Sequence, residues 1–164
     1  MSIAVAQELK LSEPKRVIVE DVDASNYRDD RSTPQTLIAS YYNAINKQEY
    51  VRAYSYYSPG GPGRGLATFT KGYEKTKSIR LALSKDADTD GGAGTLIWYQ
   101  PLAIEAESED GKKEVFGGCY TIRLVEPGAQ GTLPFKPMEI ERGWLVKLPL
   151  TTLEEGVPKS CDPT

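Results

Sequence analysis

Residues 33–54 read TPQTLIASYYNAINKQEYVRAY, and this stretch decides the fold because its apolar side chains repeat at a helical period. Thr33 supplies a capping hydroxyl, and Pro34 follows in the first turn, where its missing N–H costs nothing. A stripe with i, i+3, i+4 and i+7 spacing then comprises Leu37, Ile38, Tyr41, Tyr42, Ala44 and Ile45. The sequence therefore predicts a first helix that runs to about Lys47.

Two shorter helices are predicted after the first. One spans about Glu49 to Tyr57 and is stopped by Pro59, and the other spans about Leu66 to Thr76. Between them, residues 58–65 (SPGGPGRG) are too rich in glycine and proline for regular structure, so a mobile loop is expected. This loop lacks the Gly-Lys-Ser/Thr ending of a phosphate-binding loop, so it is interpreted as a linker.

From Ser78 onward the apolar period changes from helical to two, which is typical of half-buried strands. An Asp-Gly turn at Asp110 and Gly111 favours an antiparallel hairpin between two long strands. Helices followed by strands predict an α+β fold in which the helices pack on one sheet face. The predicted strands are about Ser78–Leu83, Thr95–Glu107, Glu114–Val125 and Met138–Leu148.

The register YY-x-A-I-x-x-x-x-Y-x-x-A-Y, from Tyr41 to Tyr54, strongly resembles the opening helices of nuclear-transport-factor-2-like domains. Residues 69–76 (FTKGYEKT) resemble the third helix of that family entering its first strand, and residues 116–124 (FGGCYTIRL) resemble the central strand of a bacterial exported subgroup. Over residues 33–148 the resemblance implies three N-terminal helices packed on a strongly curved, cone-shaped antiparallel sheet of about four strands. That subgroup resembles lipoproteins and envelope proteins without an assigned reaction, so the resemblance implies a pocket but no activity.

Residues 32–150 are the predicted domain, between an N-terminal extension (residues 1–31) and a C-terminal tail (residues 151–164). The extension is expected to be an extended arm with room for one strand around Ile18. Ala4-x-Ala6 matches the small-residue pattern before a signal-peptidase cut, which favours a signal-peptide remnant; an ordinary terminus is the alternative.

The chain has 2 cysteines, Cys119 in a predicted strand and Cys161 in the proline-rich tail. An even count with one member in an exposed terminus favours a disulfide that pins the tail, and two free thiols of a cytosolic protein are the alternative. The sequence thus favours a periplasmic or extracellular protein, with a membrane-anchored lipoprotein as a variant of this prediction.

Composition excludes several classes of function. The 20 basic and 23 acidic residues give a net charge of -3, which offers no general attraction for nucleic acid. No apolar run approaches the roughly 20 residues of a membrane helix. A count of 0 histidines removes serine–histidine triads and most zinc sites. No cofactor is predicted.

Acid–base chemistry would therefore fall to carboxylates, and no catalytic residue is predicted. Glu74, beside Tyr73, comes nearest to a carboxylate on an inward face. Four other carboxylates alternate with apolar residues and are predicted to be solvated: Glu105, Glu107, Glu139 and Glu141.

Residues 86–91 (DADTDG) match the first half of a calcium loop, with Asp86, Asp88 and Asp90 at alternate positions. The closing bidentate glutamate is missing, because Ile97 stands in its place. A hairpin loop rich in Asp and Gly explains this composition, so no metal site is predicted.

The chain contains 10 tyrosines and 2 tryptophans, several of them on predicted inward faces. The residues predicted to line the cone are Tyr73, Trp98, Tyr120, Arg123 and Trp144. The alternative is that the aromatic rings simply fill the cone as core.

The leading hypothesis is a non-enzymatic exported domain that binds a small apolar ligand in the cone or a protein partner on the open sheet face. A second hypothesis is a small isomerase, dehydratase or polyketide-cyclase-like enzyme that uses a carboxylate, Glu74, and a tyrosine. The third is a structural domain of the cell envelope that forms a homodimer through the sheet face.

Overall fold

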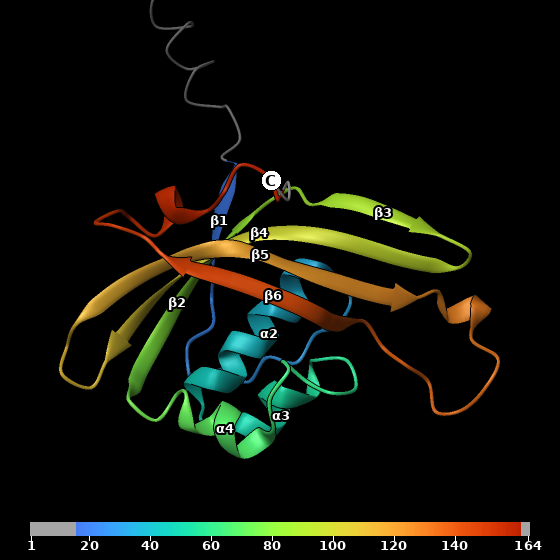
Figure 1. Ribbon diagram of the computed structural model, residues 1–164, viewed down its shortest axis with the longest axis horizontal. Coiled ribbons are helices and arrows are strands. Elements are labelled where there is room, and N and C mark those ends of the chain that lie inside the picture. The colour runs from blue at the N-terminus through green and yellow to red at the C-terminus, as the bar shows by residue number, and fades with distance from the viewer. Residues whose placement is uncertain (1–15, 162–164) are drawn as a thin grey trace, which may run out of the picture.

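The computed structural model describes residues 16–161 and packs a layer of helices beneath one large sheet (Figure 1). No helix in this described range is long and apolar enough to cross a membrane. The signal-peptide pattern at Ala4 and Ala6 lies outside it. The elements are β1 (Val17–Glu20), α2 (Pro34–Asn46), α3 (Tyr50–Ser55), α4 (Leu66–Lys71), β2 (Thr76–Ser84), β3 (Asp88–Gly92), β4 (Thr95–Ser108), β5 (Lys113–Val125), η1 (Pro127–Ala129), β6 (Glu139–Lys147) and η2 (Glu154–Gly156).

Helix α2 begins where the sequence predicts. The Thr33 hydroxyl accepts a hydrogen bond from the Thr36 amide at 3.1 Å, and the Thr36 hydroxyl accepts one from the Thr33 amide at 3.0 Å. This reciprocal capping box satisfies two amides that the first turn would otherwise leave unpaired. The apolar stripe is buried against the sheet, so α2 is the central helix of the inner layer.

A buried amide clamps the N-terminal arm onto α2. The Asn43 side chain, which is 0% exposed, donates to the carbonyls of Asp23 at 3.0 Å and Asn26 at 2.9 Å. Its oxygen accepts from the Arg28 amide at 3.0 Å and from the Arg52 guanidinium at 2.9 Å. Because every polar atom of this amide has a partner, its burial fixes the path of the arm.

The sheet has the antiparallel order β1-β2-β4-β5-β6, with β3 paired to β4 beside β2. The ladder between β4 and β5 runs from Thr95↔Val125 to Glu107↔Lys113, and Gly111, with a φ of 85°, allows the turn that joins them. The described sheet thus has six strands rather than the predicted four, and it stays open because β1 and β6 do not pair.

Strand β3 replaces the predicted Asp-Gly loop. Asp88 and Asp90 pair with Tyr99 and Ile97 of β4, and the turn at Ala93 and Gly94 has φ values of 54° and 83°. An extended strand does not curl around an ion, so the half calcium motif forms no loop. Among residues 16–161, no group of three or more His, Cys, Asp or Glu side chains is placed to hold a metal.

The C-terminal tail crosses the outer face of the sheet, opposite the helices. Leu153 and Val157 are buried against Ala82 and Ala103 in a small second core. A Cβ at Gly117 would lie 2.2 Å from a backbone oxygen of the tail, so only glycine lets the tail backbone approach β5 this closely. The tail is therefore packed against the sheet along part of its length.

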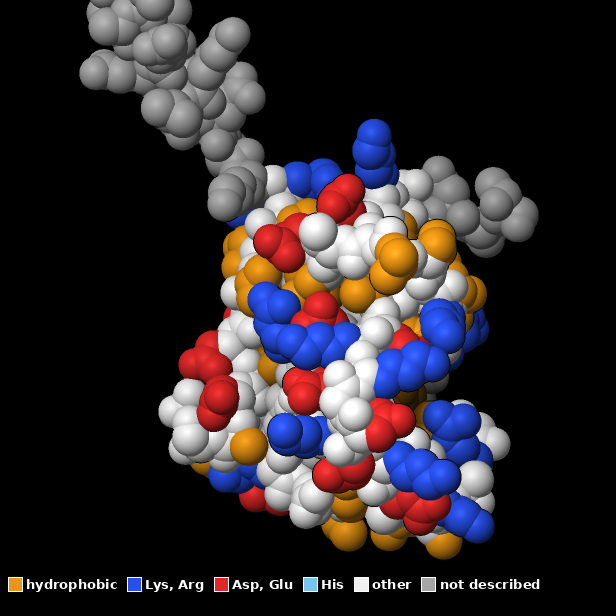
Figure 2. Space-filling view, turned by 90° about the vertical axis from the view of Figure 1, so that its left-hand side faces the viewer, with side chains coloured by type: hydrophobic (Ala, Val, Ile, Leu, Met, Phe, Trp, Pro, Cys, Tyr) orange, Lys and Arg blue, Asp and Glu red, His pale blue; other side chains and the backbone are white. Residues whose placement is uncertain are grey.

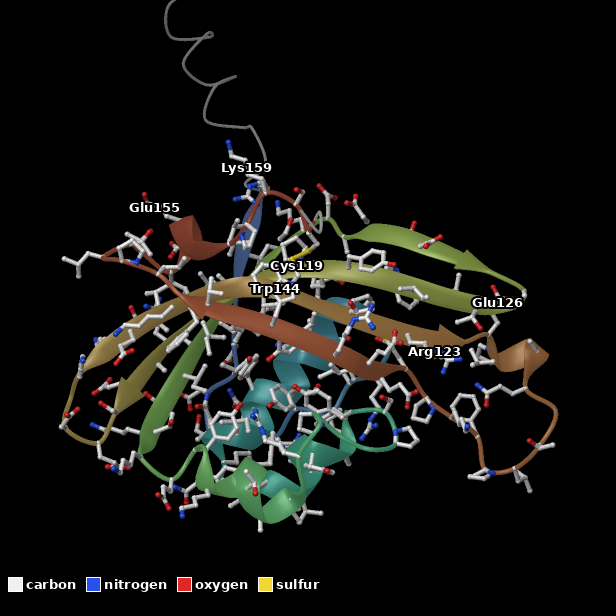
Figure 3. All side chains as sticks on the ribbon, in the orientation of Figure 1. Cys119, Arg123, Glu126, Trp144, Glu155 and Lys159 are labelled. Carbon is white, nitrogen blue, oxygen red and sulfur yellow. A yellow bond between two sulfur atoms is a disulfide. The ribbon has the colours of Figure 1, made fainter. Side chains whose placement is uncertain are left out.

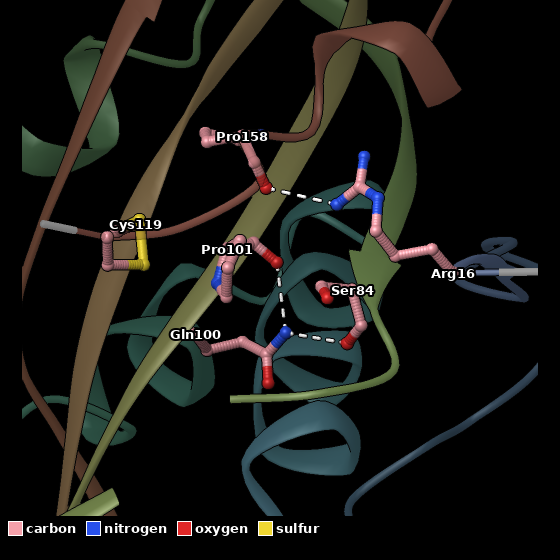
Figure 4. Close-up of a disulfide and its surroundings, with 7 residues drawn as sticks. Arg16, Ser84, Gln100, Pro101, Cys119 and Pro158 are labelled. Carbon is pink, nitrogen blue, oxygen red and sulfur yellow. Dashed lines mark hydrogen bonds between the residues drawn. A yellow bond between two sulfur atoms is a disulfide. The ribbon is translucent and has the colours of Figure 1, made fainter. Parts of the chain in front are cut away.

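The predicted disulfide is confirmed. Cys119 on β5 is bonded to Cys161 in the tail, with Cα atoms 5.9 Å apart and 42 residues of separation (Figures 3 and 4). Arg16 also donates to the carbonyls of Val157 and Pro158, both at 3.2 Å, so it ties the tail to the strand at the start of the described chain.

The side of the molecule at the β4–β5 turn carries interspersed charge. Figure 2 shows basic and acidic side chains mixed there rather than gathered by sign. Among them, Arg80 lies 3.2 Å from Glu105 and Lys77 lies 3.7 Å from Glu107, which are cross-strand pairs of β2 and β4. This side therefore offers no large field of a single sign.

Candidate functional site: a tyrosine-lined pocket

A pocket of about 500 Å3 opens on the inner side of the sheet, between β6, the glycine-rich loop of residues 58–65 and the helices. Four tyrosines contribute to its lining, together with three charged residues and parts of the loop and of β6. The tyrosines are Tyr41, Tyr57, Tyr73 and Tyr120, and the charged residues are Arg64, Glu141 and Arg142.

Hydrogen-bonded tyrosines lie at the floor of the pocket and, in the case of Tyr42, are buried behind it. The hydroxyls of Tyr41 and Tyr73 lie 3.0 Å apart, and those of Tyr42 and Tyr120 lie 2.5 Å apart. The helical stripe of α2 supplies Tyr41 and Tyr42, while strand alternation turns Tyr120 of β5 inward. Elements far apart in sequence thus bring their hydroxyls together inside an aromatic cluster.

Burial keeps these hydroxyls protonated. It raises the pKa of Tyr41, Tyr42 and Tyr120 well above the ordinary tyrosine value, and it is the largest cause of the raised pKa of Tyr57 and Tyr73. Near neutral pH the pocket therefore presents neutral O–H groups that can both donate and accept hydrogen bonds.

Alkaline pH is expected to destabilise the fold. Burial and the hydrogen bond to Asp29 raise the pKa of Tyr56 to about 12. An unfolded tyrosine loses its proton near pH 10, so above that pH the folded state binds more protons and stability falls. The stability that the protonated Tyr56 contributes is intact below about pH 10 and is lost towards about pH 12. Urea unfolding at about pH 8 and about pH 11 should show a lower free energy at the higher pH; equal values would contradict the prediction.

Glu141 reaches the pocket because β6 contains a bulge. The register pairs Thr121 with Arg142 but Ile122 with Ile140, so Glu141 is an extra residue on β6. The Ile140 backbone instead bonds to the end of α3, donating to the Tyr56 carbonyl at 2.8 Å. Strict alternation predicted a solvated Glu141; this is corrected, because the bulged residue is half-buried and lines the pocket.

The glycine-rich loop, predicted to be a linker, forms one wall of the pocket. The Tyr54 hydroxyl donates to the Arg64 carbonyl at 2.8 Å, and the Gly61 amide donates to the Ser58 carbonyl at 2.9 Å. Gly61 has a φ of 62°, and a Cβ there would lie 2.4 Å from the Tyr54 ring. The loop is therefore folded over Tyr54, and this places Arg64 at the pocket.

The residues predicted to line one cone lie in different places. Tyr73 and Tyr120 line the pocket, while Trp98 is half-buried against the inner core outside it. Arg123, near the end of β5, has its guanidinium 3.8 Å from the Glu139 carboxylate and does not line the pocket.

Trp144 lies on the opposite face of the sheet, beside the disulfide (Figure 3). It is 52% exposed and pairs with Cys119 in the β5–β6 ladder. The prediction placed it inward because the bulge at Glu141, which shifts the alternation of β6, leaves no trace in the sequence. Trp144 instead borders an outer hollow of about 680 Å3 that Tyr99 and Asp88 also line.

The carboxylate proposed for an isomerase is not in the pocket. Glu74 is exposed, and it is absent from the pocket lining although its neighbour Tyr73 is present. A general base must come within hydrogen-bond reach of the proton that it removes. A reaction that pairs Glu74 with a pocket tyrosine therefore has no support from this geometry.

Comparisons with known proteins give one structural likeness. No family model matches the chain, and no curated protein matches it. Among solved structures, it is similar to a nuclear transport factor 2 (NTF2-like) superfamily protein from Salmonella enterica subsp. enterica serovar Typhimurium str. LT2. The identity is 14%, the match covers 73% of this chain and 92% of that chain, and the TM-score is 0.48.

Proposed function

We propose that this chain is a binding protein whose inner pocket takes up a small polar molecule. The observation that carries the proposal is the convergence of neutral tyrosine hydroxyls with Arg64 and Glu141 on one pocket of about 500 Å3. This volume falls in the range of small-molecule sites, which combine aromatic walls with a few convergent polar groups.

The chemistry of the lining favours a polar ligand over the apolar one expected from the sequence. An apolar molecule would cover the exposed Arg64 guanidinium without replacing its hydrogen bonds to water. A ligand with hydroxyl, carbonyl or carboxylate groups satisfies that guanidinium, while its non-polar parts pack on the aromatic rings.

We further propose that this binding takes place in the periplasm or outside the cell. The Cys119–Cys161 disulfide supports this location, because such bonds persist in oxidising compartments and are rare in the cytosol.

Native mass spectrometry of protein purified from its own cells tests the binding function. We expect a small molecule that is retained in the native spectrum and lost after denaturation. Arg64→Ala should weaken its binding about 10-fold or more, since hydrogen bonds to charged groups contribute about 1.5–3 kcal/mol. Arg80→Ala, which removes an exposed arginine outside the pocket, is the matched control and should leave binding unchanged.

Two results would contradict the proposal. One is a bare polypeptide mass in the native spectrum. The other is a bound molecule whose affinity is the same in the wild type and in Arg64→Ala.

A further inference from the structure

Strand β6 has one unpaired edge over part of its length. It ends the strand order and pairs with β5 on one side only. The Leu148 amide donates to the Val115 carbonyl at 2.9 Å. The backbone groups of Leu148 therefore point towards β5, in a hydrogen-bonded pair of the ladder. Because such positions alternate in antiparallel pairs, the backbone groups of Gly143, Leu145 and Lys147 point away from β5.

The free edge begins beside the pocket. At Ile140 the edge of β6 that faces away from β5 is occupied. The Ile140 amide donates to the Tyr56 carbonyl at 2.8 Å, and the Ile140 carbonyl accepts from the Ser58 amide at 2.9 Å. Beyond the bulge, no backbone hydrogen bond within residues 16–161 joins Gly143 or Leu145 to an element other than β5. Both residues also line the tyrosine pocket, so the open edge and the pocket are adjacent.

Between Arg142 and Lys147, this edge lacks the charged side chains that usually protect an exposed strand. Residues 143–146 read GWLV and carry no charge. Trp144 and Val146 are each 52% exposed. Unprotected apolar edges of this kind are templates for pairing with another extended chain.

The charges at the pocket mouth complement an acidic group. Arg64 lines the pocket and forms no ion pair within the described part of the chain. Arg142 pairs with Thr121 and also lines the outer hollow, so its side chain belongs to the outer face. An incoming carboxylate can pair with the Arg64 guanidinium and accept hydrogen bonds from the tyrosine hydroxyls beside it.

We propose that β6 accepts an extended peptide as an additional strand and that an acidic side chain of this peptide enters the tyrosine pocket beside Arg64. Backbone hydrogen bonds to Gly143 and Leu145 supply affinity, and the pocket selects one alternate side chain, as in other cases of strand addition. This inference rests on the proposed binding function, because it assigns a ligand class to the same pocket.

Two libraries of capped heptapeptides provide the test, one with a central Glu and one with a central Gln, all other positions being randomised. We expect the immobilised protein to enrich peptides from the Glu library at least 10-fold over the Gln library, and Arg64→Ala to abolish this preference. Arg80→Ala should retain the preference. Enrichment that is equal for the two libraries would overturn the acidic-peptide proposal.

Methylation of single amide nitrogens in an enriched peptide then tests strand pairing. We expect binding to be lost at every second position and kept at the positions between, because only alternate amides face β6. A pattern without this two-residue period would overturn strand addition. If native mass spectrometry finds a small ligand sensitive to Arg64→Ala while neither library is enriched, the peptide inference fails and the binding function stands.

Discussion

Replacing Cys119 and Cys161 by serine is expected to lower the free energy of unfolding by about 4 kcal/mol. The disulfide closes a loop of 42 residues, and the chain entropy that this loop removes from the unfolded state corresponds to about that value. The variant should still fold, because the inner core beneath the sheet includes neither cysteine. Urea unfolding followed by circular dichroism would measure the difference.

The single variant Cys161→Ser is the informative control. It breaks the same bond but leaves the Cys119 thiol in place, so its free energy of unfolding should match that of the double variant. Reduction of the wild type should have the same effect. A loss of no more than about 0.5 kcal/mol in all three samples, the range of ordinary surface changes, would show that Leu153 and Val157 hold the tail without the bond.

Asn43→Ala is expected to lower the free energy of unfolding by about 3 kcal/mol. The substitution removes both donors and the acceptor of a fully buried amide. The carbonyls of Asp23 and Asn26, the Arg28 amide and part of the Arg52 guanidinium would then lack their partner. Each buried group left unsatisfied costs about 1–3 kcal/mol, and access of water to the arm offsets part of the sum.

Val51→Ala is the matched control for this prediction. Val51 is 71% exposed on the neighbouring helix α3, so its truncation should change the free energy of unfolding by less than about 0.5 kcal/mol. Amide hydrogen exchange supplies a second measurement, because residues 21–31 should lose protection in Asn43→Ala before the sheet does. Equal stability of Asn43→Ala and the wild type would show that the amide does not clamp the arm.

The parts of the fold that the sequence predicts are those with strong local determinants. The α2 start follows from Thr33 and Pro34, and the long hairpin follows from its Asp-Gly turn. Tyr120 could be placed in the pocket because strand alternation orients it without tertiary information. Tyr73 follows the end of α4, but it still packs on Phe69, the contact that the i, i+4 spacing predicted.

The parts that the sequence did not reveal depend on contacts between distant segments. Strand β3 is rich in Asp and Gly, which disfavour strands, and it forms because β4 extends far enough to pair with it. Glu141 entered the pocket through a bulge, which alternation alone cannot show. Arg64 lies at the pocket because the Tyr54 hydroxyl donates a hydrogen bond to its backbone carbonyl. The glycine-rich composition of the loop gives no indication of this contact.

The contact between Arg16 and the tail also determines how the molecule would be oriented on a tether. Its guanidinium bonds to Val157 and Pro158, so the described chain begins and ends on one side of the sheet, away from α3 and α4 (Figure 1). A linker or surface attached where the described chain begins or ends, at residue 16 or residue 161, would thus hold the molecule from its outer face. Immobilisation at either of these two positions should leave the tyrosine pocket directed towards the surrounding solution.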